Sequence, residues 1–153
     1  MEFDLEVTID RPVTAVFAYV TDIRNVPEWQ ESAESAEWLE VGRRFRERRH
    51  FMGRHADLEL EVTALEPERR FDVRAAKAPV KFEIHHAFEG VDGGTRVRVH
   101  GKAKLGGALR LAAGMARRQA EHQFRRDFER LKEVLERRDE ESPSDRPPRL
   151  ADE

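Results

Sequence analysis

The feature of this 153-residue chain that most constrains its fold is a change of hydrophobic period near Gly106-Gly107. From Gly42 to Lys104, apolar and polar residues alternate in segments separated by turn-forming residues, which is the pattern of consecutive half-buried strands. After Gly106-Gly107 the apolar residues recur at helical spacing until about Arg138. The sequence therefore predicts an antiparallel meander followed by one long helix that crosses the sheet.

The turns of the meander predict which residues face one another across neighbouring strands. We place these turns at Gly53-Arg54, Glu66–Arg69, Ala76–Pro79 and Asp92-Gly93, the last being typical of a type I′ hairpin. They set Glu47 opposite Leu60, Val62 opposite Phe71, Ala75 opposite Val80 and His86 opposite Val99. With these turns the apolar residues of every strand share one face, whereas a one-residue slip would put one strand's apolar set outside.

The N-terminal segment adds a strand and two short helices. Residues 3–9 alternate apolar and polar, as in a half-buried strand, and Pro12 suits the first turn of a helix. Apolar residues at helical spacing follow up to Val20, and a second weak helical turn leads to Pro27-Glu28-Trp29. Trp29 is costly to leave in water, so this segment must cover something apolar.

We expect residues 1–138 to form a single domain. The tail, residues 139–153, is charged, proline-rich and without hydrophobic period, so we expect it to be disordered. The start of the chain has no basic and apolar leader, and no run is long enough to span a bilayer. These features favour a soluble cytoplasmic protein with no integral membrane segment.

Composition argues against several classes of site. With no cysteine, the chain has neither a thiol nucleophile nor a thiolate metal site. His85 and His100 should lie opposite each other on the outer face. Because the sequence gives them no carboxylate or thiolate support, we expect them to be surface residues rather than ligands of a metal ion. The arginine-rich stretch 43–50 contains one aromatic residue, which favours a solvated strand face over a nucleic-acid partner. No glycine-rich phosphate loop is present, and we expect no cofactor.

Charge is unevenly placed along the chain. Residues 1–42 hold 2 basic and 10 acidic side chains, whereas residues 98–138 hold 12 basic and 5 acidic. Such asymmetry can steer an anionic partner towards one face, and a well-solvated, heavily charged surface is the reading that we favour.

The opening stretch RPVTAVFAYVTDIRNVPEW resembles the recurrent P-x-x-x-V-F-x-x-x-x-D-x-x-x-x-P-x-W stretch of the START-like, or SRPBCC, superfamily, which includes polyketide cyclase/dehydrase-like and lipid-transfer-like proteins. Further landmarks are Gly42, the turns at Glu66-Pro67 and Gly93-Gly94-Thr95, and LKEVLE at 131–136. The resemblance covers residues 2–137 and implies an α+β helix-grip fold. In this fold a curved antiparallel sheet of about seven strands wraps on a long C-terminal helix, with two short helices after strand one. Trp29 would then cap a cavity mouth or pack against the core.

The long helix carries small residues in its first half and large ones in its second. The first half presents Ala112, Ala113, Ala116 and Ala120, and the second presents Phe124, Phe128, Leu131 and Leu135. If the helix lies level over the sheet, the alanines overlie a void suited to an apolar ligand and lined by Leu60, Phe71, Phe82, Ile84 and Val99. The alternative is that the alanines let the helix pack closer to the sheet.

Three polar residues fall on the concave face of the predicted sheet: Glu47, Arg49 and His86. Each needs a partner, because burying a polar group unpaired is costly. Together they could orient a polar ligand head, with His86 the only plausible general acid or base near neutral pH. The simpler interpretation is that a bulge turns Glu47 and Arg49 outward and that His86 is a hydrogen-bonded packing residue.

Our leading hypothesis is non-enzymatic binding of a small hydrophobic or lipid-like molecule between sheet and helix. Its predicted binding residues are Trp29, Arg49, Leu60, Phe71, Phe82, Ile84, His86, Val99, Ala113, Ala116 and Ala120. One alternative is a polyketide cyclase/dehydrase-like enzyme that uses the same cavity, with His86 as a weak catalytic candidate. Another is an interaction protein that acts through its basic helix face. The oligomeric state stays open.

Overall fold

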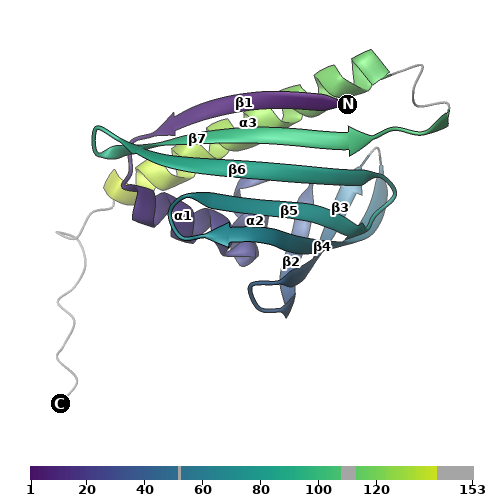
Figure 1. Ribbon diagram of the computed structural model, residues 1–153, viewed down its shortest axis with the longest axis horizontal. Helices are drawn as coiled ribbons and strands as arrows, with labels where there is room; N and C mark the ends of the chain where they lie inside the picture. Colours follow the sequence, from purple (N-terminus) through teal and green to yellow (C-terminus); the bar gives the residue numbers. More distant parts are fainter. Residues whose placement is uncertain (52, 108–112, 141–153) are drawn as a thin grey trace.

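The computed structural model describes residues 1–51, 53–107 and 113–140. Its elements are β1 (Glu2–Ile9), α1 (Val13–Thr21), the 3₁₀ turn η1 (Ile23–Asn25), α2 (Val26–Trp29), β2 (Ala33–Glu40), β3 (Arg44–Phe51), β4 (Arg54–Glu66), β5 (Arg70–Lys77), β6 (Lys81–Val91), β7 (Gly94–Lys104) and α3 (Ala113–Glu140). Figure 1 shows the long α3 running alongside an open sheet. The predicted α+β helix-grip fold is confirmed. The predicted disordered tail lies outside the described residues from 141 onwards.

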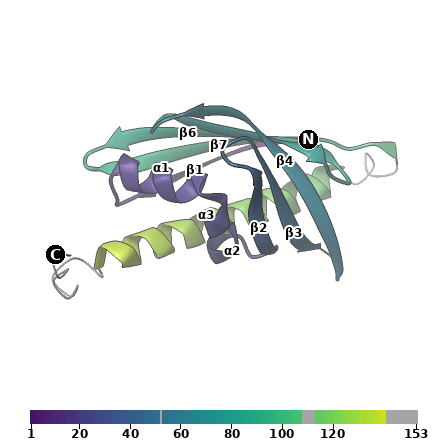
Figure 2. The same cartoon turned by 90° about the horizontal axis from the view of Figure 1, so that it is seen from below.

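The seven strands form one antiparallel sheet in the order β1-β7-β6-β5-β4-β3-β2. The meander predicted after the short helices is therefore confirmed for β2 to β7, and β1 joins it by pairing with β7. Figure 2 shows all the helices on one side of the sheet, towards which β2, β3 and β4 curve. The concave face of the sheet and α3 thus enclose the interior of the molecule.

The predicted strand register is confirmed at one hairpin, whereas at two others the observed register differs from the predicted one. His86 lies opposite Val99, as the Asp92-Gly93 turn predicts. However, residues 52–53 connect β3 to β4, so Glu47 lies opposite Leu58 rather than Leu60. The pairing of β5 with β6 is likewise displaced by two residues, because Arg74 lies opposite Glu83. Since side chains alternate with a period of two, neither displacement moves a residue to the other face.

A β-bulge corrects the register between β4 and β5. Three residues rather than the predicted four connect these strands, with Glu68 at a φ of 63°. By itself this shorter connection would reverse the faces, but the register shifts again between Val62 and Ala64. The bulge leaves Val62 opposite Val73 instead of the predicted Phe71, with both side chains still on the apolar face.

The second half of α3 closes the core against the sheet and the short helices. Phe128, Leu131 and Leu135 are each at most 2% exposed. Trp29, at the end of α2, packs edge-on against Phe128 with ring centroids 5.0 Å apart. Burying large apolar side chains of this kind stabilises a fold by about 1.5–3 kcal/mol each. Of the helices that the structure describes, none combines the length and apolar character needed to cross a bilayer.

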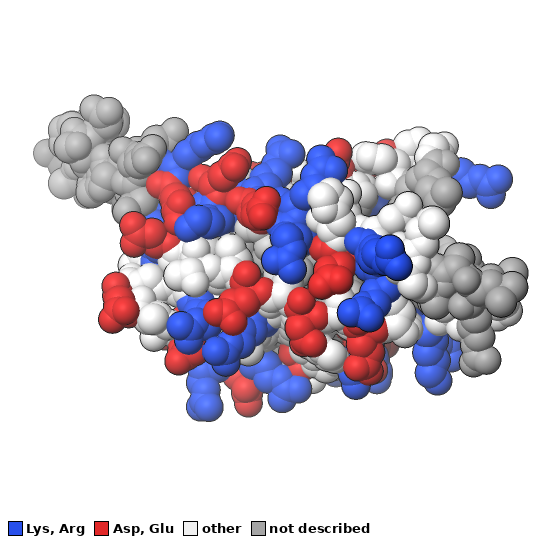
Figure 3. All heavy atoms as spheres, turned by 90° about the horizontal axis from the view of Figure 1, so that it is seen from above, with Lys and Arg blue, Asp and Glu red and all other residues white. Residues whose placement is uncertain are grey.

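The fold brings the acidic N-terminal segment next to the basic C-terminal one. Arg98 of β7 lies within 3.4 Å of Glu6 on β1, and Arg138 of α3 lies 3.3 Å from Glu28 on α2. In Figure 3, basic and acidic side chains are interspersed over most of the visible face. The uneven charge of the sequence is thus largely matched within the chain, which favours the solvated-surface interpretation over a basic docking face.

Candidate functional site

The concave face of the sheet is covered unequally along its length. Towards α1, side chains such as Ile9, Phe88 and Val97 are at most 6% exposed. Towards the start of β6 and the first half of α3, several apolar residues pack against the core but stay half-buried: Ala56, Phe82, Ile84, Ala120 and Phe124. Apolar side chains that line a concave face and stay partly exposed to solvent are a feature of ligand sites.

The predicted apolar lining residues lie on this concave face. Leu60, Phe71 and Val99 are buried, at 3%, 4% and 1% exposure, while Phe82 and Ile84 are half-buried. Ala116 and Ala120 are also half-buried on α3, whereas Ala112 and the side chain of Ala113 lie outside what the structure describes. Ala120, Phe82 and Ile84 thus pack against the same core, and their role as the lining of a ligand site stays a prediction.

Buried Glu47 and half-buried Arg49, both on β3, form an ion pair on the concave side. Glu47 is 4% exposed, and Arg49 Nε donates to its Oε2 at 2.5 Å. Arg49 Nη1 also donates to the Ser32 hydroxyl at 2.8 Å, and Nη2 donates to the side-chain oxygen of Gln30. The suggestion that a bulge turns this pair outward is wrong. Instead, Arg49 binds both Glu47 and two side chains from the connection between α2 and β2.

Asp127 of α3 approaches the same connection from the opposite side. It is 8% exposed, and its Oδ1 accepts hydrogen bonds from the Glu31 backbone N–H at 3.2 Å and from Gln123 Nε2 at 2.9 Å. Burial raises the pKa of Asp127, and these hydrogen bonds together with the charge of Arg49 oppose the shift. The connection between α2 and β2 is thus held between β3 and α3 by buried polar groups.

Sequence reasoning missed Asp127, Gln123, Gln30 and Ser32 as parts of this network. A signal for Asp127 was present, because it lies seven residues after Ala120, on the same helix face. A carboxylate on the buried stripe of a helix needs an explanation. Gln30 and Ser32 carried no such signal, since polar residues in a connection are ordinary.

His86 lies in the packed part of the concave face, surrounded by aromatic rings. It is 6% exposed and within 5.6–6.5 Å of the rings of Phe71, Phe128 and Phe88. Its Nδ1 lies 2.8 Å from the carbonyl oxygen of Phe71 and must donate to it, since a carbonyl can only accept. Burial lowers the pKa of His86 to about 4, so the imidazole is neutral near pH 7. A neutral imidazole with its proton on Nδ1 leaves Nε2 as an acceptor.

Trp29 occupies the same packed region rather than a loop above it. It is 2% exposed against Phe128, and its indole Nε1 is buried without a hydrogen-bond partner among the described residues. Its placement corresponds to the core alternative for this residue.

The outer face carries the predicted histidine pair. His85 and His100 lie directly opposite each other, with ring centroids 6.2 Å apart. Carboxylates that the sequence did not place here flank them: Asp72 lies 2.9 Å from His85 and Asp4 lies 2.7 Å from His100. Even so, within the described ranges no three such side chains are arranged to hold a metal ion.

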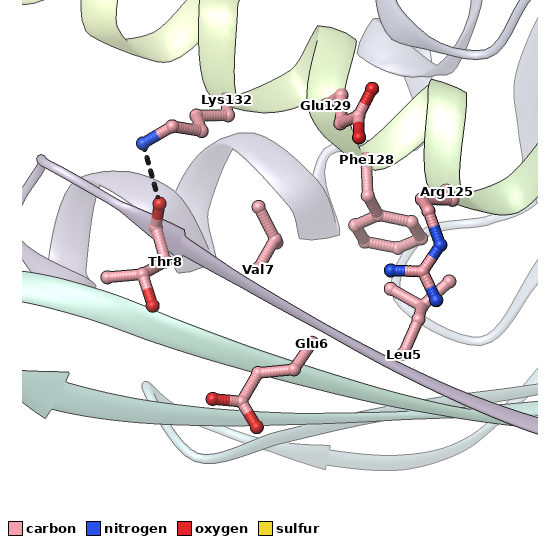
Figure 4. Close-up of a pocket in the computed structure, with 8 residues that line it drawn as sticks. All are labelled: Leu5, Glu6, Val7, Thr8, Arg125, Phe128, Glu129 and Lys132. Atoms are coloured by element: carbon pink, nitrogen blue, oxygen red, sulfur yellow. Dashed lines mark hydrogen bonds between the residues drawn. The ribbon is translucent and has the colours of Figure 1, made fainter.

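Two hollows open on the surface away from the half-buried apolar residues. One, of about 460 Å³, lies over the outer face around Ala87, His85 and His100. The other, of about 210 Å³, lies between β1 and α3. Figure 4 shows Val7 in this groove, with Phe128 near one end and Lys132 near the other, where Lys132 Nζ donates to the carbonyl oxygen of Thr8 at 2.8 Å. Its mixed lining resembles an ordinary helix–strand seam.

Comparison with known proteins gives one family and many similar folds. A family model described as polyketide cyclase/dehydrase and lipid transport matches residues 1–136. No curated protein sequence matches the chain. A START superfamily protein from Mycobacterium smegmatis is 14% identical with a TM-score of 0.75, over 89% of this chain and 97% of that one.

Two further solved structures are similar. The Zhui aromatase/cyclase from Streptomyces sp. R1128 is 16% identical with a TM-score of 0.74, over 90% of this chain and 94% of its own. A protein from Deinococcus radiodurans is 24% identical with a TM-score of 0.67, over 87% of this chain and 95% of its own. At such identities the likeness establishes the fold alone, whereas the family match extends over nearly the whole described chain. The chain therefore belongs to the polyketide cyclase/dehydrase and lipid transport family.

Proposed function

We propose that the protein binds a small hydrophobic or lipid-like molecule between the concave face of the sheet and the first half of α3. The observation that carries this proposal is the group of apolar side chains that pack on the core yet stay half-buried, among them Phe82, Ile84 and Phe124. Covering them with an apolar ligand would remove further surface from water, at about 25 cal/mol per Å². The family description, which includes lipid transport, supports the same class of ligand.

The alanines of α3 fit this proposal in a specific way. Ala116 and Ala120 are half-buried and have short side chains, whereas Phe128 and Leu131 further along are large and at most 2% exposed. A helix that carries small residues at one end only leaves room at that end. A ligand would occupy this room and contact both the alanine stripe and the sheet.

Native mass spectrometry of protein purified without added ligand tests the proposal. We expect a retained small molecule that is lost on denaturation, or, for ligand-free protein, saturable binding of the neutral fluorescent probe Nile red at one site per chain. Denatured protein is the control for non-specific partition of the probe. A bare polypeptide mass together with no saturable probe binding would remove the proposal.

A second candidate function is cyclase/dehydrase-like catalysis, in which a substrate bound at the proposed site would have to reach His86, two residues after Ile84 on the same face of β6. The Phe71 carbonyl fixes its Nδ1 proton, so Nε2 is available as a weak base on the concave side. Once a substrate is identified, His86→Gln should abolish turnover while largely preserving substrate affinity. Equal loss of binding and stability would instead indicate a packing role.

A further inference from the structure

Four metal-ligating side chains form a row across the outer face of the sheet. Asp72 of β5 lies opposite His85 of β6, and His85 lies opposite His100 of β7. His100 in turn lies opposite Asp4 of β1. These four strands are neighbours in the sheet, as Figure 1 shows, and all four residues line the hollow of about 460 Å³ on this face. The fold therefore places two imidazoles between two carboxylates.

The two carboxylates of the row contact Nδ1 of both imidazoles. His85 Nδ1 lies 2.9 Å from Asp72 Oδ2, and His100 Nδ1 lies 2.7 Å from Asp4 Oδ1. When each Nδ1 donates a hydrogen bond to its carboxylate, each Nε2 keeps a lone pair. Carboxylate–histidine pairs of this kind orient imidazoles that ligate metal ions. The expectation that these histidines are not metal ligands depended on a lack of carboxylate support, which the fold supplies.

A further carboxylate lies beside each Nε2. His85 Nε2 is 3.2 Å from Glu83 Oε2, and His100 Nε2 is 3.9 Å from Glu2 Oε2. A neutral imidazole has one N–H, so it can donate to only one of its two carboxylates. Its other nitrogen faces an acceptor, which is favourable only when a cation lies between them. Nitrogen and oxygen ligands of one zinc ion are about 3.4 Å apart, because each bond is about 2.0–2.2 Å long. Both separations are close to what a shared ion requires.

The charges around the row also favour a cation. Asp72 is 1% exposed, and its Oδ1 is buried without a hydrogen-bond partner among the described residues. Arg70 Nε donates to the other oxygen, Oδ2, at 2.7 Å. Between Glu83 and Glu2 lies Lys102, whose Nζ is 4.0 Å from Glu2 Oε1. A metal ion would have to replace only this loosely held ammonium.

We propose that the outer face of the sheet binds a divalent metal ion of the zinc class through two imidazoles and two carboxylates: His85, His100, Glu83 and Glu2. As they stand, these side chains do not surround one point, and within the described ranges no group of three does. However, the side chains of Glu2 and Glu83 are 63% and 51% exposed, so they can turn towards a shared ion. The ring centroids of the two histidines are 6.2 Å apart, close to the roughly 5–6 Å expected for two imidazoles on one zinc ion.

The ligand set selects the metal, and the position of the site separates it from the proposed function. Imidazole nitrogen favours Zn²⁺, Ni²⁺ and Cu²⁺, whereas Mg²⁺ and Ca²⁺ prefer oxygen ligands. Side chains alternate along β6, so the site lies on the opposite face of the sheet from Phe82 and Ile84. The ion would connect β1, β6 and β7 and should therefore stabilise the folded chain.

Calorimetric titration with Zn²⁺, on protein first treated with a chelator, tests the inference. We expect saturable Zn²⁺ binding, a higher melting temperature in the presence of Zn²⁺, and binding of Mg²⁺ that is at least roughly tenfold weaker. A lack of saturable Zn²⁺ binding, or equal binding of Mg²⁺, would overturn the inference. Neither result depends on Nile red binding at the concave face, so this failure is distinct from failure of the proposed function.

Histidine variants assign the ion to this row. His85→Gln and His100→Gln, each checked for folding by circular dichroism, should weaken Zn²⁺ binding by roughly tenfold or more and lose the shift in melting temperature. The matched control is His55→Gln, which removes one histidine of the cross-strand pair with His50 and should leave this binding unchanged. Unchanged Zn²⁺ affinity in both His85→Gln and His100→Gln would overturn the assignment.

Two variants at exposed positions provide an independent check that keeps both histidines. Glu83→Gln removes a carboxylate ligand and should weaken Zn²⁺ binding, whereas Lys102→Gln removes the competing ammonium and should strengthen it. Calorimetric titration of both variants beside the wild-type protein gives the comparison. No change in either variant, or changes of the opposite sign, would show that Zn²⁺ does not lie among these side chains.

Discussion

His86 is a histidine kept neutral inside a cluster of aromatic rings. Its ring stacks on Phe71 at 28° between planes, and its one hydrogen bond within the described structure goes to a backbone carbonyl rather than to a carboxylate. No neighbouring group fully offsets the cost of burying a positively charged imidazole. Burial is therefore the largest effect on His86 and lowers its pKa to about 4. Protonating His86 must therefore loosen the centre of the concave face.

This predicts a specific dependence of stability on pH. In the unfolded chain His86 has an ordinary pKa near 6.5, so between pH 6.5 and about 4 the unfolded state binds a proton that the folded state does not. The free energy of unfolding should be fully maintained above pH 6.5 and fall as pH is lowered through this window, by on the order of 3 kcal/mol in total. Urea unfolding at a series of pH values measures the slope.

The variant His86→Gln should lose most of this slope, whatever its effect on stability at pH 7. His122→Gln, at an exposed position on α3, serves as the surface control. The lowered pKa values of Asp22 and Glu136 act at lower pH, and they do so equally in all three proteins. An identical slope in wild type and His86→Gln would show that another group causes the acid sensitivity.

At the scale of elements, the contact between β1, β7 and α3 depends on a glycine. A Cβ atom at Gly101 of β7 would lie 2.6 Å from Cζ of Phe3 on the neighbouring β1. Phe3 cannot turn away freely, because it is 6% exposed and its ring lies 4.9 Å from that of Phe124. The absence of a side chain at Gly101 therefore lets the aromatic pair join the edge strand to the helix.

We predict that Gly101→Ala lowers the free energy of unfolding by about 1–3 kcal/mol, the usual range for overpacking a core. Gly90→Ala is a matched control in the adjacent strand β6, because its nearest contact would be Val13 Cγ1 at an ordinary 3.8 Å. Denaturant unfolding of both variants gives the comparison. Equal effects of the two substitutions would mean that Phe3 yields without cost.

The elements themselves were largely predictable from the sequence, because period and turn chemistry are local properties. The Asp92-Gly93 hairpin set the pairing of β6 with β7 correctly, since this dipeptide strongly favours one turn type. The other registers were displaced because several loop lengths suit the same residues, and a bulge such as that near Val62 leaves no mark in the hydrophobic pattern. The apolar residues of these strands still lie on the predicted face of the sheet, because each net displacement of the register is two residues.

The candidate site was predictable in its apolar part and not in its polar part. Phe82, Ile84 and Ala120 follow from alternation and helical spacing. The further partners of Arg49 come from a connection with no regular pattern, and Asp127, which binds the backbone of that connection, lies some eighty residues after Glu47. Such contacts depend on how strongly the sheet curves, which single-sequence patterns do not specify.

At the scale of the whole molecule, the acidic N-terminal part of the chain lies next to the basic C-terminal part. The acidic strand β1 and the basic strand β7 are neighbours, and Arg138 of α3 forms an ion pair with Glu28 of α2. Exposed pairs of this kind contribute about 0–1 kcal/mol each and weaken with salt. The fold is therefore held mainly by its apolar interior.

We predict that deleting residues 141–153 leaves the free energy of unfolding unchanged within about 0.5 kcal/mol, the usual range for changes outside packed regions. The segment ESPSDRPPRLADE offers a core almost nothing apolar to bury. Thermal unfolding of the shortened chain beside the full one provides the measurement. A clear fall in melting temperature would show that the segment docks on the domain.

The measurement that most directly tests the account is the effect of enlarging the alanine stripe. In a close-packed interior, Ala116→Leu or Ala120→Leu would cost about 1–3 kcal/mol of strain. In a ligand site the larger side chain has room and buries apolar surface. Gln119→Leu, at an exposed position on the same helix, controls for an added leucine.

We predict that both alanine variants keep or raise the melting temperature of ligand-free protein while weakening Nile red binding, and that Gln119→Leu leaves probe binding unchanged. Strong destabilisation by both alanine variants, with no saturable probe binding in the wild-type protein, would contradict the account.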